Sequence, residues 1–248
     1  MWKRAIMLPV FYISMALFGI GALTLNALCW LLCFLPRCRG LERFARVSIH
    51  LLMRLWMNYL NLVGVIVITW PEIRALRRMR GVVIVANHPN LLDICWILAA
   101  SSRVTCFMKS GIRRNNFFAA SAALAGYISN DSGMDGLHEA VDRLEDGDIL
   151  SVFPEGTRTT TPPMNHPIKP GFALIARQAG APIQTLFIRS STRCFTKGVF
   201  FRPGPLPIRF DLRFGPMLHP APERPARETA DAVEHAMRAS LESPHLWH

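Results

Sequence analysis

The chain has 248 residues, 51% of which are hydrophobic, and its formal net charge at pH 7 is +11. This length predicts one large domain or two small ones, and the apolar content argues against a protein that is soluble throughout. The excess positive charge favours anionic partners, which include lipid headgroups, phosphorylated substrates and nucleic acid.

The most apolar segment runs from Ala5 to Leu35 without a charged residue, which is long enough to cross a membrane. Residues 1–60 also carry seven basic residues against Glu42 alone. Because this charge flanks the apolar segment, membrane lipids are favoured as the partner and nucleic acid is not expected. A cleaved signal peptide is disfavoured, since its apolar core would have roughly 7–15 residues and be followed by a small-residue cleavage site.

Two arrangements of this segment are open. One straight helix would reach roughly 45 Å, at about 1.5 Å per residue, against a hydrocarbon core of about 30 Å. Gly19-Ile20-Gly21 lies near the middle and could divide the segment into two short helices that dip into one leaflet. Basic residues at both ends would then place both ends on the cytoplasmic side. We favour this hairpin over a single tilted span.

An amphipathic helix is predicted over Leu41–Leu60, where it could cover the core, lie on the membrane, or do both. Beyond it, strands are predicted at Leu62–Trp70, Gly81–Ala86, Arg103–Lys109, Asp148–Phe153, Pro182–Ile188 and Ile208–Phe214. Helices are predicted at Leu91–Ala100, Asn116–Ala125, Gly133–Glu145, Phe172–Ala179 and Arg227–Leu241. This alternation predicts an α/β fold with a mixed, largely parallel sheet flanked by helices, after an N-terminal apolar helical membrane motif. We expect membrane-associated helices in residues 1–60 and one α/β domain in residues 61–248.

The six cysteines form no CxxC pair, and no Cys/His cluster has the spacing of a zinc site. We therefore expect neither a disulfide framework nor a bound metal. A reducing, cytosolic environment is the natural setting for such cysteines.

The sequence NHPNLLD, residues 87–93, follows the apolar strand GVVIVA. Ligand sites in open α/β sheets gather at the carboxyl ends of strands, where this segment begins. Near pH 7 a neutral imidazole such as His88 can take a proton from an alcohol that attacks a thioester. A carboxylate such as Asp93 on its other ring nitrogen would fix the tautomer and stabilise the imidazolium. The spacing alone does not exclude a surface histidine beside a helix-capping aspartate.

A second polar segment, residues 152–158 (VFPEGTR), ends the strand DILSVF. Pro-Glu-Gly is also an ordinary turn. Thr157 and Arg158, however, add a hydroxyl and a guanidinium, and arginine is suited to bidentate recognition of phosphate or carboxylate. Lys169 offers another cation just before a helix, whose N-terminus favours an anion.

The two segments, in this order after apolar strands, resemble the motifs of the glycerol-phosphate and lysophosphatidic-acid acyltransferases, the PlsC-like family. The resemblance covers roughly residues 60–190. It implies that His88 is the general base and that Asp93 orients it. The expected substrate-binding residues are Asn87, Glu155, Gly156, Thr157, Arg158 and Lys169.

The resemblance also implies the partners and the location. The acyl donor would be acyl-CoA or acyl carrier protein, and no cofactor is expected. The protein would act at a membrane, with its catalytic domain on the cytoplasmic face of a bacterial inner membrane. The acceptor would be a hydroxyl of a lysophospholipid such as 1-acylglycerol-3-phosphate.

One departure from the family pattern concerns the acceptor. The intermediate motif of the family, Gly-x-x-Phe-x-Asp/Asn-Arg, supplies a second arginine to the phosphate, but Ser132 stands at that position here. The loss of one charge-assisted contact would weaken phosphate binding by roughly 1.5–3 kcal/mol, unless Lys109, Arg113 or Arg114 compensates. The alternatives are the same chemistry on an amino-acid lipid, a glycolipid or a polyene alcohol, thioester hydrolysis, and a non-catalytic membrane-binding scaffold.

Overall fold

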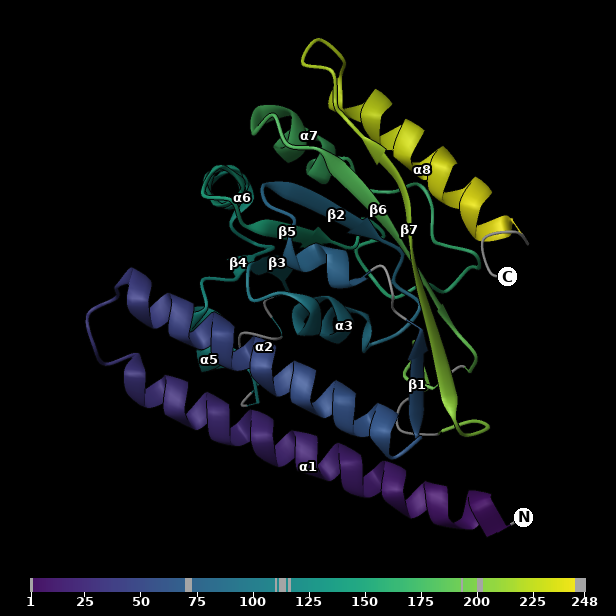
Figure 1. Ribbon diagram of the computed structural model, residues 1–248. Helices are drawn as coiled ribbons and strands as arrows, with labels where there is room; N and C mark the ends of the chain where they lie inside the picture. Colours follow the sequence, from purple (N-terminus) through teal and green to yellow (C-terminus); the bar gives the residue numbers. More distant parts are fainter. Residues whose placement is uncertain are drawn as a thin grey trace.

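A seven-stranded sheet forms the centre of the protein (Figure 1). The computed structural model describes residues 2–69, 73–109, 111, 115, 117–192, 194–199 and 203–243. Its strands are β1 (Ile66–Thr69), β2 (Val82–Ala86), β3 (Val104–Met108), β4 (Ile128–Ser129), β5 (Ile149–Val152), β6 (Ile183–Ser190) and β7 (Ile208–Leu218). They lie in the order β1-β7-β6-β2-β5-β3-β4, and all neighbours are parallel except β6 and β7. The predicted mixed, largely parallel sheet is confirmed.

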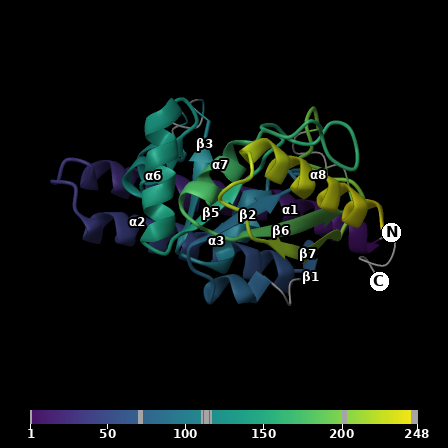
Figure 2. The ribbon, with the colours of Figure 1, turned by 90° about the horizontal axis from the view of Figure 1, so that it is seen from above.

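Helices cover both faces of this sheet. They are α1 (Trp2–Leu32), α2 (Arg39–Leu62), the 3-10 helix η1 (Ile73–Arg77), α3 (Asp93–Ala100), α5 (Ala119–Leu124), α6 (Gly133–Glu145), α7 (Gly171–Gln178) and α8 (Ala226–Glu242). The core on one face joins the sheet to α1, α2, α3 and α5, and the core on the other face joins it to α6, α7 and α8. Seen from above, α8 lies over β6 and β7 (Figure 2).

Strand β2, in the middle of the sheet, is apolar at every position. Val82, Ile84 and Ala86 point into the core beneath α3, whereas Val83 and Val85 point into the core beneath α7. Because both faces are covered, all five residues are buried. The continuous apolar run is the expected pattern for a parallel strand inside such a sheet.

Every predicted strand and helix in residues 61–248 overlaps an observed one, and Gly133–Glu145 has the predicted bounds. Two short elements, η1 and β4, were not predicted. Strand β4 has two residues at the edge of the sheet, which is too short for a periodic pattern. Trp70 and Asn116, the end residues of two predicted elements, lie outside the described residues.

The expected division of the N-terminal apolar segment into two short helices is wrong. Helix α1 runs without a break through Gly19 and Gly21 to Leu32, and the chain reverses only before α2 begins (Figure 1). A Cβ atom on Gly21 would lie 3.0 Å from Leu52 Cδ1 of α2. This glycine therefore allows the two helices to approach closely, and the hairpin consists of α1 and α2.

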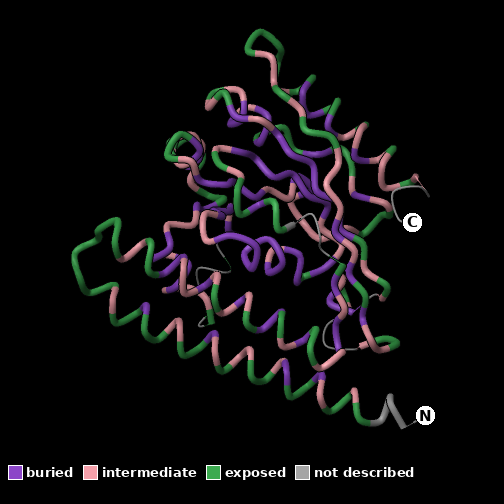
Figure 3. Tube along the Cα trace, in the orientation of Figure 1, coloured by how far each residue is buried: buried purple, intermediate pink, exposed green. Residues whose placement is uncertain are grey.

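Helix α1 exposes much of its apolar surface. Its segment Ile6–Leu32 is long and apolar enough to cross a membrane, and 17% of its most apolar 18-residue window is buried. On the inner side, Phe18 stacks on Trp56 of α2, with ring centroids 4.0 Å apart. On the outer side, large side chains such as Ile13 and Ile20 are exposed, and Figure 3 shows exposed residues along the described part of the helix. The side chains of Lys3 and Arg4 lie outside the described part of the chain.

Candidate active site

The two predicted motifs meet at the carboxyl ends of two central strands, β2 and β5. Strands β2 and β5 are parallel neighbours, so the segments that follow them emerge side by side. His88 lies two residues beyond β2, and Phe153 directly follows β5. The imidazole stacks on the Phe153 ring, with centroids 4.1 Å apart and an interplanar angle of 20°. This contact fixes the plane of the histidine ring.

His88 and Asp93 form the predicted pair. His88 Nδ1 lies 2.9 Å from Asp93 Oδ2, and the same oxygen accepts a 2.7 Å hydrogen bond from the main-chain N–H of Asn90. The histidine side chain is 18% exposed, whereas the aspartate side chain is fully buried. With Nδ1–H donating to the carboxylate, Nε2 is the nitrogen that can accept a proton.

The buried surroundings of Asp93 disfavour its ionised form. Burial raises the pKa of this carboxyl to about 6, although the hydrogen bond and charge of His88 and the Asn90 N–H act in the opposite direction. Its Oδ1 atom has no hydrogen-bond partner among the described residues. The ionised form of a carboxyl in such surroundings is stabilised by a cation beside it. Asp93 is therefore placed to stabilise the imidazolium that forms when His88 takes a proton.

Both main-chain polar groups of His88 form hydrogen bonds with the segment that follows β5. Its N–H donates to Glu155 Oε1 at 2.8 Å, and its carbonyl oxygen accepts a hydrogen bond from the Thr159 N–H at 2.7 Å. Glu155 is buried, and its two oxygens also accept hydrogen bonds from the Thr159 hydroxyl and the Asn165 N–H, each at 2.8 Å. The carboxylate that was predicted to bind substrate therefore holds the histidine segment against the turn after β5.

Asn87 also makes contacts within the protein. Its Nδ2 donates to the Ile188 carbonyl oxygen at 2.9 Å, and its Oδ1 accepts a hydrogen bond from the Ile188 N–H at 2.7 Å. The side chain is buried and joins the end of β2 to β6. A substrate could reach this amide only if Ile188 released it.

Arg158 reaches across to the connection between β6 and β7. Its Nη1 donates to the carbonyl oxygens of Phe195 and Thr196, at 2.9 and 3.2 Å. Among the described residues, Nε and Nη2 have no hydrogen-bond partner. A guanidinium has five N–H donors, so Arg158 can hold this connection and still present donors to an anion.

Segment 194–196 is hydrogen-bonded to the turn that follows His88. Asn90 Nδ2 donates to the Cys194 carbonyl oxygen at 2.5 Å, and the Leu91 N–H donates to the Phe195 carbonyl oxygen at 3.1 Å. Phe195 is buried and has φ +63°, which is uncommon for a residue other than glycine. Its ring lies 5.9 Å from the ring of Phe11, so helix α1 packs directly on this segment.

The remaining predicted binding residues lie around the turn after β5. Gly156 has φ +68°, and a Cβ atom there would lie 2.9 Å from Lys169 Nζ, so glycine gives the lysine room to lie across the turn. The Lys169 N–H donates to the Pro154 carbonyl oxygen at 2.9 Å. Lys169 is exposed and Thr157 is half-buried.

Comparison with known proteins identifies the family of this chain. The acyltransferase family model matches residues 68–189, a region that contains the His88–Asp93 pair and the turn with Arg158. The chain belongs to this acyltransferase family. A search of curated proteins found no match to this acyltransferase.

The acyltransferase also resembles a solved structure over nearly its whole length. The crystal structure of the 1-acyl-sn-glycerophosphate (LPA) acyltransferase PlsC from Thermotoga maritima matches it with a TM-score of 0.70 and 21% sequence identity. The match covers 97% of this chain and 95% of that chain, so the shared PlsC-like fold includes the N-terminal helices as well as the sheet.

In this acyltransferase, the described residues contain no group of three or more His, Cys, Asp or Glu side chains that could hold a metal ion. The arrangement suits proton transfer at His88 Nε2, beside a turn that offers the cations Arg158 and Lys169. Ser132 precedes α6 and makes no capping hydrogen bond with its side chain. Arg113 and Arg114, which were suggested to compensate for it, lie outside the described residues.

Sequence reasoning did not anticipate the residues that support the acyltransferase site. Asn90, Thr159 and Asn165 each hold a main-chain group of the two motifs in place, namely the Leu92 N–H, the His88 carbonyl oxygen and the Arg158 carbonyl oxygen. Asn90 lies inside the histidine motif, so the sequence could have identified it as a candidate. Asn165 lies in a loop rich in Thr and Pro, in which no pattern distinguishes it.

Proposed function

We propose that the protein transfers a fatty acyl group from acyl-CoA or acyl carrier protein to a hydroxyl of a lysophospholipid such as 1-acylglycerol-3-phosphate. The observation that carries this proposal is the His88–Asp93 contact of 2.9 Å beside the turn with Arg158. His88 Nε2 accepts the hydroxyl proton while the hydroxyl oxygen attacks the thioester carbonyl carbon. The carbon–sulfur bond breaks, an ester bond forms, and the imidazolium returns the proton to the departing thiolate.

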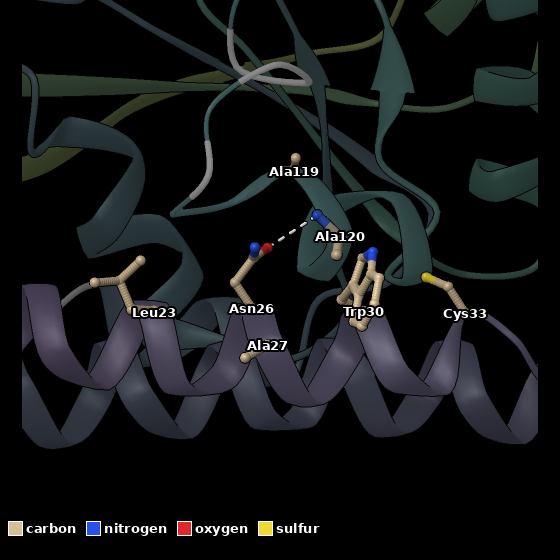
Figure 4. Close-up of a pocket in the computed structure, with 7 residues that line it drawn as sticks. All are labelled: Leu23, Asn26, Ala27, Trp30, Cys33, Ala119 and Ala120. Atoms are coloured by element: carbon tan, nitrogen blue, oxygen red, sulfur yellow. Dashed lines mark hydrogen bonds between the residues drawn. The ribbon is translucent and has the colours of Figure 1, made fainter.

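Two features support a lipid substrate at a membrane. Helix α1 exposes apolar side chains along its outer side. A mostly apolar groove of about 550 Å³ lies between α1 and α5 (Figure 4). There Asn26 accepts hydrogen bonds from the N–H groups of Ala120 and Ser121. We place the protein at a membrane through α1 and α2, with its active site on the cytoplasmic face, where both acyl donors occur. The expected host is a bacterial inner membrane.

A second acceptor class is favoured by one observation. Ser132 replaces the arginine that relatives use as a second phosphate contact, so a phosphate-free lipid alcohol remains a candidate. Replacement of Ser132 with Arg should improve the use of a phosphate-bearing acceptor by about one to two decades in kcat/KM. An unchanged ranking of acceptors would argue against this explanation.

The central test is His88→Ala in purified protein, with acyl-CoA and lysophospholipid as substrates. Removal of a general base should lower kcat by about 10²–10⁴. His138→Ala, which changes an exposed histidine on α6, is the matched control and should retain wild-type turnover. Mass spectrometry of ester and free fatty acid separates transfer from hydrolysis. Near-wild-type ester formation by His88→Ala would overturn the proposal.

A further inference from the structure

The loop between the turn after β5 and helix α7 is organised by Asn165. Its Oδ1 atom accepts three hydrogen bonds, from the Thr160 N–H at 2.9 Å, the Thr160 hydroxyl at 2.9 Å and the Thr161 N–H at 3.1 Å. Its Nδ2 donates to the Arg158 carbonyl oxygen at 3.2 Å. One side chain therefore closes residues 158–165 into a compact loop.

The main chain of Asn165 connects this loop to the catalytic pair. Its N–H donates to Glu155 Oε2 at 2.8 Å, and the other carboxylate oxygen accepts the His88 N–H at 2.8 Å. A displacement of Asn165 would therefore remove one of the donors that orient the carboxylate. The carboxylate in turn fixes the main chain from which the imidazole projects.

The far end of the loop is attached to α8. Glu234 Oε2 accepts the Ile168 N–H at 3.0 Å, and Arg227 Nη1 donates to the Ile168 carbonyl oxygen at 3.2 Å. Ile168 and Met164, on either side of Asn165, are each 1% exposed in the core beneath α7 and α8. The loop thus has two buried anchors, and Asn165 sets the conformation between them.

We infer that Asn165 is a positioning residue for acyl transfer, acting through Glu155 on His88. This inference rests on the proposed role of His88 as the base. The alternative is that Asn165 only stabilises an exposed loop. The two differ in what the residue controls, since a positioning residue affects turnover by folded protein, whereas a purely structural residue affects only the folded fraction.

The test compares Asn165→Ala and Asn165→Asp with wild type, with kcat measured per folded molecule. Asn165→Ala loses all four side-chain hydrogen bonds, and a shift of the base of about 1 Å can reduce turnover by about 10²-fold. We expect kcat to fall by about ten- to a hundredfold while KM for the acyl donor stays within about twofold. Asn165→Asp keeps the oxygen that accepts three of these bonds, and its kcat should lie between wild type and Asn165→Ala.

Ser101→Ala is the matched control, because it also removes a side-chain oxygen that accepts a hydrogen bond from a main-chain N–H, that of Arg103. This turn precedes β3 and so lies at the amino ends of the parallel strands, away from the active site. Wild-type kcat in both Asn165 variants, or in Asn165→Asp if Asn165→Ala does not fold, would overturn the inference. If His88→Ala loses activity in the same assay, only the inference fails. If His88→Ala remains active, the assignment of the base fails, and the inference fails with it.

Discussion

The buried carboxylate of Glu155 accepts a 2.8 Å hydrogen bond from the main-chain N–H of His88. These residues are 67 positions apart, and the parallel pairing of β2 with β5 brings them together. The contact joins the segment that carries the imidazole to the turn that carries Arg158. A shift in one motif is therefore transmitted to the other through this carboxylate.

Glu155→Gln should lower turnover without weakening substrate binding. The carboxylate accepts hydrogen bonds from His88, Thr159 and Asn165, and a glutamine of the same shape must present an NH₂ group to at least one of these donors. A lost charge-assisted hydrogen bond is worth about 1.5–3 kcal/mol. We expect kcat to fall by at least about tenfold, with the KM of the acceptor within about twofold.

Steady-state kinetics with varied acceptor would check this result. Glu139→Gln, which changes a carboxylate on α6 that contacts Arg143, is the matched control and should have wild-type kinetics. A rise in the acceptor KM at constant kcat would instead support the role that the sequence predicted for Glu155, direct contact with substrate.

The sequence allowed both motifs to be placed at strand ends, because apolar strands such as β2 have an unmistakable composition. It also predicted the His88–Asp93 pair, whose members are five residues apart. It could not predict the contact of Arg158 with Phe195, since that contact depends on how the connection between β6 and β7 folds back over the site.

The N-terminal segment likewise contains a feature that the sequence alone could not predict, because it depends on tertiary packing. Gly19 and Gly21 would break an isolated helix more easily than other residues, and the sequence alone gave no partner for them. In the structure Gly21 lies against Leu52 of α2, so that tertiary packing decides its role. Close helix approach, rather than chain reversal, explains this glycine.

Asp93→Asn should reduce activity and change how stability depends on pH. The pKa of Asp93 is about 6 in the folded protein, because burial raises it from the ordinary aspartate value of 3.8. Between roughly pH 4 and 6 the folded state binds more protons than the unfolded state, so this carboxyl contributes stability at low pH that is lost as pH rises through 6. Asparagine does not ionise. The free energy of unfolding of the variant, relative to wild type, should therefore rise by about 2–3 kcal/mol from pH 4 to pH 8.

Chemical denaturation at several pH values measures this difference. The kcat of Asp93→Asn should fall by at least about tenfold at pH 8, because a neutral amide cannot stabilise the imidazolium. Asp148→Asn is a useful contrast, since it removes the charge of one of the two carboxylates that pair with the buried Arg46 and should destabilise the protein at neutral pH. A stability difference between Asp93→Asn and wild type that stays constant from pH 4 to pH 8 would contradict the pKa direction.

Arg158→Lys should discriminate between acceptors. The arginine holds the carbonyl oxygens of Phe195 and Thr196 through Nη1, and Nε and Nη2 remain for an anion. A lysine has one nitrogen and cannot serve both groups in the same geometry. With a phosphate-bearing lysolipid we expect KM to rise by about tenfold or more, whereas a phosphate-free lipid alcohol should show a smaller rise. Equal losses with both acceptors would show that Arg158 mainly supports segment 194–196.

Gly21→Leu should loosen the N-terminal hairpin and thereby affect the active site. Even a Cβ atom at this position would lie 3.0 Å from Leu52 Cδ1, so leucine must push α1 away from α2, at a cost of about 1–3 kcal/mol in stability. Because Phe11 of α1 packs on Phe195, the shift should also lower kcat. Thermal unfolding in detergent and turnover of the folded fraction measure the two effects. Ile20→Leu, at an exposed position of the same helix, should change neither. If Gly21→Leu lowered the unfolding temperature but kept full turnover, the packing of α1 on segment 194–196 would have no catalytic role.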